Sequence, residues 1–268
     1  MESILLKFVF PLPPSLFINS LSLINLPISV SNGLSEVRGK NLKYSKFWEN
    51  STKSSKKEQK WFSSRKGMLI CYTPAFLASL GMFFIFPHGD VGMLLVSLAL
   101  AFHFFKRLFE VLFIHNYSGS MDLDTTILIS ISYVSYSTSM IYAQHLSQSL
   151  VEPSIDLKYF GIIIFLIGII GNFYHHYVLS LLRTKDSSVK EYRIPKGGLF
   201  GLVICPHYLF ELLGFVGVSF ISQTPHSFSI ALGMIFYLMG RSYATRAWYV
   251  SKFEDFPKHV KALIPYVF

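Results

Sequence analysis

The chain has 268 residues, of which 51% are apolar and only 15% are charged, and its mean hydropathy is +0.44. A soluble domain carries roughly a quarter charged residues, so this composition argues against a soluble protein and for several membrane crossings. The formal net charge of +9 comes mostly from a few connecting segments, and it is therefore no sign of nucleic-acid binding.

Six windows are apolar and long enough to span about 30 Å of hydrocarbon. They lie at 68–87, 91–113, 125–146, 159–182, 199–222 and 226–248. A seventh window, 11–31, is interrupted by prolines, and it lacks the basic start and the cleavage site of a signal peptide. We therefore expect a retained first helix and an all-α, multi-pass membrane bundle of about seven transmembrane helices.

Lysine and arginine concentrate in alternate connections. Of the 24, ten lie at 38–66, five at 183–196 and five at 241–261. The positive-inside rule places these segments in the cytosol. We expect the N-terminus to face away from the cytosol, the C-terminus to be cytosolic, and the basic loop at 34–66 to contact anionic membrane lipids. The aromatic and charged residues near Tyr44 suit either an interfacial segment or a ligand mouth.

Asn172, His176 and Arg183 fall on one face of the helix expected at 159–182, because they are four and seven residues apart. Taken singly, His176 can be a satisfied core residue and Arg183 can reach the interface with its long side chain. Taken together beside a basic loop, they suggest a groove for an anionic ligand that enters from the cytosol.

The next loop strengthens that interpretation. Tyr192 and Arg193 precede Pro195, and Gly197 and Gly198 allow close backbone approach to a ligand. We expect the following helix to begin directly after these glycines, so that its free N–H groups can receive phosphate. The spacing is not that of a Rossmann fingerprint.

His207 and Glu211 share a helix face within an apolar window, where a carboxylate needs a partner or a ligand. They can form a purely structural pair or part of a ligand site. Arg241, followed by Arg246 and Tyr249, can meet phosphate or headgroups near the cytosolic end of the last helix. The scattered histidines form no metal-binding box, so we expect no metal, and the two cysteines are expected to be packing residues.

These late motifs resemble the C-terminal half of the steroid 5α-reductase family. The resemblance rests on Asn172, the loop at 192–198, the run CPHYLFE at 205–211 and the tail FEDFPK at 253–258. It implies a membrane protein of the endoplasmic reticulum that reduces activated C=C bonds in lipids with NADPH. The family residues that line the NADPH site correspond to Asn172, Arg183, Tyr192, Glu211, Arg241 and Tyr249; we add His176 and His207 as cofactor-binding candidates.

The resemblance divides the chain into N-terminal helices at 1–100 and a reductase-like domain at 101–268. The run KRLFEVLFIH at 106–115 is similar to the trans-2-enoyl-CoA reductases of very-long-chain fatty-acid elongation. His207 is similar instead to the polyprenol reductases. Such mixed features are typical of a plant-type member of the family.

One departure concerns the proton donor. The family places a tyrosine directly after the histidine that matches His103, and here that position is Phe104, which has no proton to give. Tyr72 falls near the place of the family's partner glutamate. Tyr72 is therefore the first candidate for the catalytic acid, with His103 second.

Three functions follow. The first is an NADPH-dependent reductase of a 3-oxo-Δ4 steroid or a trans-2-enoyl-CoA. The second is a catalytically silent membrane protein that binds lipid or associates with other lipid-synthesis enzymes. The third is a lipid-directed methyltransferase, which the order Pro206-His207-Tyr208 and the reductase tail disfavour.

Overall fold

The computed structural model describes residues 4–47, 61–86, 90–117, 119–182 and 192–268. Within these ranges the chain forms seven α-helices and little strand, which confirms the predicted all-α membrane bundle. The helices are α1 (Leu16–Val37), α3 (Ser64–Ile85), α4 (Val91–Phe109), α5 (Leu123–Ser147), α6 (Lys158–Leu181), α7 (Pro206–Ser222) and α8 (Pro225–Lys252).

Shorter elements join the helices. The 3₁₀ turns are Ile4–Lys7, Ser45–Phe47 and Gly198–Gly201, and a π-helical turn at Glu110–Ile114 prolongs α4. Strands β1 (Trp61–Ser63) and β2 (Ser120–Asp122) pair antiparallel, with Trp61 opposite Asp122. This strand pair holds the start of α3 beside the start of α5.

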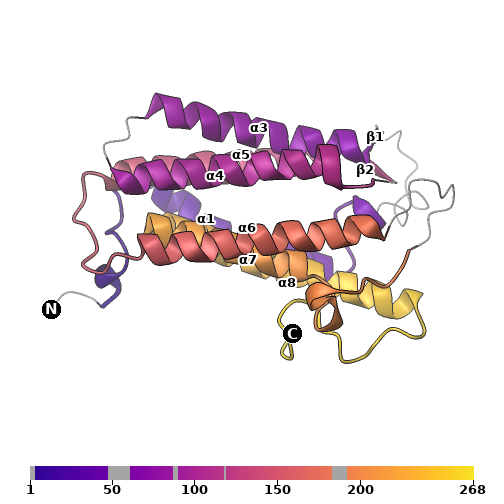
Figure 1. Cartoon of the computed structure of the whole chain (residues 1–268). Coiled ribbons are helices and arrows are strands. Elements are labelled where there is room, and N and C mark those ends of the chain that lie inside the picture. Colours follow the sequence, from indigo (N-terminus) through magenta and orange to yellow (C-terminus); the bar gives the residue numbers. More distant parts are fainter. Residues whose placement is uncertain (1–3, 48–60, 87–89, 118, 183–191) are drawn as a thin grey trace.

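The helices form two groups that lie one above the other (Figure 1). In one group α3 packs against α4 and α5; in the other α1 packs along α8 and α6 along α7. Glycine permits close contacts between helix backbones: a Cβ at Gly168 would lie 2.4 Å from the backbone nitrogen of Gly214, and one at Gly240 would lie 2.2 Å from the Gly33 oxygen. Small residues at such crossings are typical of membrane helices.

Local signals explain where several helices begin. Ser15 caps α1, Asp90 caps α4 through a bond from the Met93 N–H, and Thr224 caps α8. A side-chain oxygen at this position satisfies an N–H that the helix itself leaves without a partner. At the end of α7, Gln223 adopts a left-handed conformation with φ of 51° and turns the chain into α8.

Each predicted apolar window overlaps one helix, but one boundary was wrong. The window 199–222 was expected to be helical directly after Gly198; instead a 3₁₀ turn intervenes and α7 begins at Pro206. Proline suits the first turn of a helix, because it lacks an N–H that would have no partner there. The N–H groups that could receive an anion therefore lie near His207 rather than near the glycines.

Within the described residues, three helices are long and apolar enough to cross a membrane: Ser64–Ile85, Val91–Ile114 and Lys158–Leu181. The shorter α7 is also apolar. Large apolar side chains such as Phe84, Phe102 and Ile163 are exposed, whereas Glu110 and Arg241 are buried. An apolar outside with charges inside is the pattern of a protein that lies in lipid.

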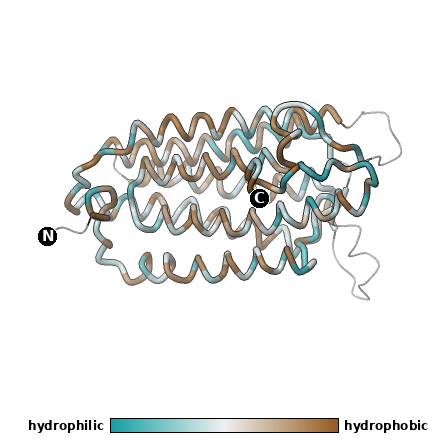
Figure 2. Tube along the Cα trace, turned by 90° about the horizontal axis from the view of Figure 1, so that it is seen from below, coloured by the Kyte–Doolittle hydropathy of each residue, from teal (hydrophilic) through white to brown (hydrophobic). Residues whose placement is uncertain are grey.

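The C-terminal ends of α1, α4, α6 and α8 lie at the same end of the bundle (Figure 1). In Figure 2 hydrophobic residues dominate along the helices, and hydrophilic stretches gather at this end. The described basic residues that follow these helices include Lys46, Arg193 and Lys258. We call this end the basic end.

Candidate functional site

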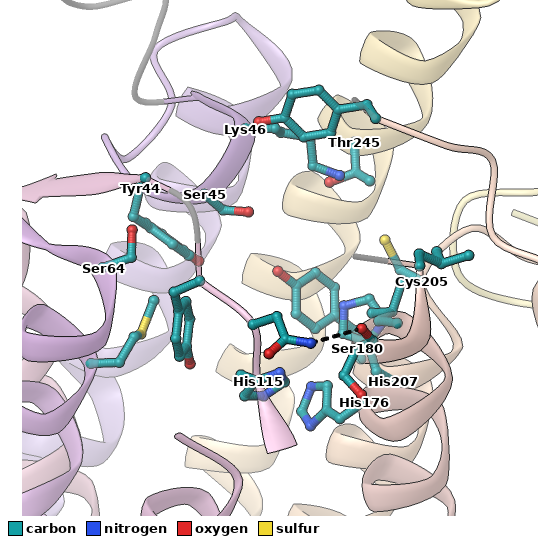
Figure 3. A pocket seen from close by; sticks show the side chains of 18 of the residues that line it. Tyr44, Ser45, Lys46, Ser64, His115, His176, Ser180, Cys205, His207 and Thr245 are labelled. Carbon is teal, nitrogen blue, oxygen red and sulfur yellow. Dashed lines mark hydrogen bonds between the residues drawn. The ribbon is translucent and has the colours of Figure 1, made fainter. Parts of the chain in front are cut away.

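A cavity of about 230 Å³ opens at the basic end, between the two helix groups. Its wall includes Met68 of α3, Arg107 of α4, His176 of α6, His207 of α7 and Arg241 of α8. In Figure 3 three histidines, His115, His176 and His207, lie together on one side of the cavity, and Tyr44, Ser45 and Lys46 lie on another. Met68 and Arg241, which are 173 positions apart in the sequence, thus line the same cavity.

The wall of this cavity is strongly basic. Lys46, Arg107, Arg193 and Arg241 line it, and no aspartate or glutamate does so among the residues that the structure describes. Clefts lined by one sign of charge concentrate ligands of the opposite sign. The cavity is therefore suited to an anionic ligand.

Arg107 occupies the centre of a buried cluster. One terminal nitrogen, Nη2, donates to the Tyr72 hydroxyl oxygen at 2.5 Å, and the guanidinium lies 4.8 Å from the Tyr72 ring centre. The other, Nη1, lies 2.8 Å from Glu110 Oε2 and 2.9 Å from His176 Nδ1. Because the tyrosine oxygen accepts from Arg107, its own proton remains available for a ligand.

Lys106 and Asn172 join three helices beside this cluster. The Lys106 ammonium lies 3.0 Å from Glu110 Oε1 and also donates to the Asn172 side-chain oxygen. The Asn172 amide nitrogen in turn donates to the backbone oxygen of His207 at 2.7 Å. Both ends of the predicted cofactor residue Asn172 are thus used to fix α4, α6 and α7 relative to one another.

Lys106 and Arg107 share the carboxylate of Glu110, and the charge of the buried Glu211 on α7 also acts on both cations. Glu110 is fully buried, and Lys106 is 6% exposed. Within the part of the chain that the structure describes, Arg107 Nε and His207 Nδ1 are buried without a hydrogen-bond partner. Buried polar groups normally have partners, so these two atoms indicate a missing ligand or water.

The donor atoms of Glu110, His115 and His176 lie within 4.8 Å of one another, a grouping that could in principle hold a metal ion. Arg107 Nη1, however, already lies within hydrogen-bonding distance of Glu110 and His176. A second cation at the same place would be repelled. The expectation of no metal stays a prediction.

The glycines of the 192–198 loop serve a contact within the protein. Gly197 and Gly198 have φ values of 94° and 52°, which glycine adopts without strain. A Cβ at Gly198 would lie 2.6 Å from His175 Nε2, and that same nitrogen accepts the N–H of Leu199 at 3.1 Å. This close approach fixes the loop to α6, so Tyr192 and Arg193 can line the cavity.

Other predicted site residues are divided between the cavity and the core. Tyr192 and Tyr249 line the cavity, and the Tyr192 ring meets Trp248 with centres 4.8 Å apart. Glu211 is buried on α7 but is not part of the cavity wall. His103 is buried between the Phe104 and Phe215 rings, away from the cavity wall. Arg183 lies outside the described residues.

Arg241 lines the cavity but has a carboxylate partner. Its Nη1 donates to both oxygens of Glu36, at 3.0 and 2.8 Å. Arg246 instead donates to backbone oxygens of the C-terminal segment, Val260 at 2.7 Å and Lys258 at 3.0 Å. Cys71 and Cys205 are free thiols and buried, as packing residues would be.

Sequence reasoning missed the charged residues of α4 and α1. Lys106, Arg107 and Glu110 were noted only as part of a family resemblance, and Glu36 was not singled out. The signal was present, because charges within an apolar span are expensive and indicate a site. Their spacings of three and four residues also place Glu110 beside both cations on one helix face.

Comparison with known proteins identifies the family. A profile of the family described as 3-oxo-5-alpha-steroid 4-dehydrogenase matches residues 125–268, more than half of the chain. The chain therefore belongs to this family, as the sequence motifs predicted, and it is a membrane protein.

Relatives carry three different substrate names. A steroid 5-alpha-reductase DET2 of Gossypium hirsutum is 29% identical over 201 residues, which cover 69% of this chain and 76% of that protein. A very-long-chain enoyl-CoA reductase of Dictyostelium discoideum is 33% identical over 178 residues, 62% of this chain and 55% of that protein. A polyprenal reductase 1 of Oryza sativa subsp. indica is 36% identical over 128 residues, 45% of this chain and 35% of that protein.

Proposed function

We propose that this protein is an NADPH-dependent reductase of a C=C bond conjugated to a carbonyl group in a membrane lipid. The observation that carries the proposal is the basic cavity, which opens at one end of the bundle and contains Arg107 beside Tyr72. The relatives named for steroids, enoyl-CoA and polyprenal support this reaction class. A 3-oxo-Δ4 steroid and a trans-2-enoyl-CoA are the two substrates that we propose first.

The residues of the cavity fit a dinucleotide phosphate. Lys46, Arg107 and Arg193 on its wall oppose phosphate charge, and Tyr192 and Tyr249 offer aromatic faces to a flat ring. Nδ1 of His207 and Nε of Arg107 are buried polar atoms available to a ligand in the described part of the chain. His176, His207, Tyr192 and Tyr249 are therefore our candidates for direct contact with NADPH.

When bound, NADPH supplies a hydride to the β-carbon of the conjugated system. The chain must polarise the carbonyl oxygen, so that negative charge can develop there while a proton reaches the α-carbon. The Tyr72 hydroxyl suits this role, because Arg107 donates to its oxygen and leaves the O–H free to point at a substrate. Tyr72 also lies one helical turn after Met68, which lines the cavity.

His103 is a weaker candidate for the acid. Its ring packs against Phe104 and Phe215, with centres 5.0 and 5.1 Å away. Neither His103 nor Tyr72 lines the cavity itself, but Tyr72 contacts Arg107, which does. The substitution of the family's tyrosine by Phe104 thus leaves Tyr72 as the buried hydroxyl beside the cationic cluster. The ring of Phe104 is buried in the same core as Tyr72.

The proposal includes the cellular setting. The basic end of the bundle faces the cytosol, in accord with the positive-inside rule, and the membrane is that of the endoplasmic reticulum. NADPH then enters from the cytosol and the lipid from the bilayer. Association with other lipid-synthesis enzymes is part of the same proposal.

The test uses the full chain, purified in detergent, with NADPH and each substrate class in turn. NADPH deuterated at its transferable position should deliver deuterium to the β-carbon, and the α-hydrogen should come from solvent. NADPH binding without turnover of a steroid, an enoyl-CoA or a polyprenal would contradict the proposal. Activity that appears only in Phe104→Tyr would favour the catalytically silent alternative.

A further inference from the structure

The ion pair between Glu36 and Arg241 joins the last turn of α1 to the middle of α8. Both side chains are almost completely buried, at 2% and 1% exposure, and one nitrogen of Arg241 meets both oxygens of Glu36. The partners are 205 positions apart in the sequence. Burying such a charge pair costs free energy of desolvation, so the pair is a poor source of net stability. This suggests that it holds the neighbouring segments in one specific conformation.

The remaining contacts of the pair all end on residues 38–47, the segment that follows α1. The Glu36 carboxylate accepts from the Asn41 side chain at 2.6 Å and from the Leu42 N–H at 3.1 Å. Arg241 donates to the backbone oxygens of Leu42 at 3.4 Å and Tyr44 at 3.5 Å. The ion pair is therefore the structural centre of the 38–47 segment.

The same segment encloses the arginine with aromatic rings. The guanidinium carbon of Arg241 lies 4.2 Å from the Tyr44 ring centre and 4.3 Å from that of Phe47. The segment also presents Tyr44, Ser45 and Lys46 to the cavity. The Lys46 ammonium lies 4.8 Å from the ring centre of Tyr249, another cavity residue.

We propose that Glu36 and Arg241 are positioning residues for the dinucleotide site, and that they act through the 38–47 segment. Arg241 does not bind phosphate itself, because Glu36 neutralises its charge and Tyr44 and Phe47 cover its plane. The pair instead seats the segment so that Lys46 brings a positive charge to the cavity wall. This inference rests on the proposed function, and it adds a wall that lies outside the family match at 125–268.

A double-mutant cycle separates positioning from direct binding. Glu36→Gln keeps the shape but removes the charge, and Arg241→Gln removes the other partner. We expect each variant to weaken NADPH binding by about tenfold or more, since misplacement of a binding group can cost up to about 100-fold. The double variant should be no weaker than either single variant, because both changes remove the same contact.

NADPH fluorescence titration of the full chain in detergent measures these affinities. A further tenfold loss when Arg241→Gln is added to Glu36→Gln would overturn the inference, because it would show direct contact between Arg241 and the ligand. Turnover at saturating NADPH should change much less than the KM for NADPH. Lys252→Gln, which changes an exposed cation at the end of α8, is the matched control and should leave both values unchanged.

Hydrogen–deuterium exchange tests the segment without any ligand. Loss of the Glu36 charge should accelerate exchange at the Leu42 amide and across residues 38–47, while α4 and α6 stay protected. Unchanged exchange in Glu36→Gln would overturn the positioning role even if the wild-type protein bound no NADPH. A wild-type protein that binds no NADPH but shows the accelerated exchange in the variant would defeat the proposed function alone.

Discussion

Two arginines, the partly buried Arg107 on α4 and the fully buried Arg241 on α8, line the same cavity but have different partners. Arg107 shares the carboxylate of Glu110 with Lys106, and its Nε has no partner in the described part of the chain. Arg241 shares the carboxylate of Glu36 only with the neutral donors of Asn41 and Leu42 among the described residues, and it is 1% exposed. The first arrangement leaves a buried nitrogen of Arg107 without a partner in the described part of the chain, whereas the second pairs one cation with one carboxylate.

This difference shows that a charged residue in the wall of a cavity need not bind the ligand. Coulomb attraction to a ligand depends on the charge that remains after the protein's own partners are counted. By that measure the Arg107 cluster is the chemical part of the site and the Glu36–Arg241 pair is the structural part. Variants of each region should therefore fail in different ways.

The largest expected effect comes from removing the proposed acid, the Tyr72 hydroxyl, beside Arg107. Tyr72→Phe keeps the ring but removes the hydroxyl, and we expect turnover to fall by about 10²–10⁴-fold, the usual contribution of a general acid. The measurement is steady-state turnover with NADPH and the accepted lipid. Tyr133→Phe is the matched control, because its ring stacks on Tyr72 at 5.4 Å. Equal turnover in Tyr72→Phe and wild type would assign the acid to another group.

The second effect tests how the two regions differ in charge. Glu110→Gln removes the carboxylate that Lys106 and Arg107 share, whereas Glu36→Gln removes the carboxylate of Arg241 alone. Removing one partner of a buried pair costs about 3–5 kcal/mol, so both variants should melt at lower temperature and Glu110→Gln should be the less stable. Thermal unfolding in detergent measures this order. A Glu110→Gln protein as stable as wild type would refute the charge count.

The smallest effect concerns the 192–198 loop, which lies between α6 and α7. Gly198→Ala places a Cβ 2.6 Å from His175 Nε2 at a backbone φ of 52°. Strain of this kind costs about 1–3 kcal/mol, and it should also shift Tyr192 and Arg193 away from the cavity. We expect a modest loss of stability and weaker NADPH binding, measured by thermal unfolding and titration. Gly201→Ala, which meets open space, is the control.

Several residues that line the cavity could be predicted from the sequence one by one, but their hydrogen-bond partners could not. His176, His207, Tyr192, Tyr249 and Arg241 were expected at a ligand site, and all five line the cavity. Asn172 was expected there too, yet its side chain connects Lys106 to His207. The sequence pattern identifies polar groups in apolar helices, but it cannot say whether the protein or a ligand satisfies them.

The start of α7 shows a second limit. Hydropathy alone extends the window back to residue 199, because Leu199–Cys205 are mostly apolar, but the structure begins the helix at Pro206. The preceding residues are used in a parallel bridge between Val203 and Lys261. A contact with the C-terminal segment thus overrode the local preference.

The sequence by itself determined the membrane class and the order of the helices, because hydropathy and charge are properties of short stretches of chain. It also carried the motifs that place the chain in its family. Only the tertiary structure decided that Arg241 meets Glu36 and that Arg107 meets Tyr72 and His176. Those pairs depend on how each helix is rotated and shifted against its neighbours, and the packing of the whole bundle sets that arrangement.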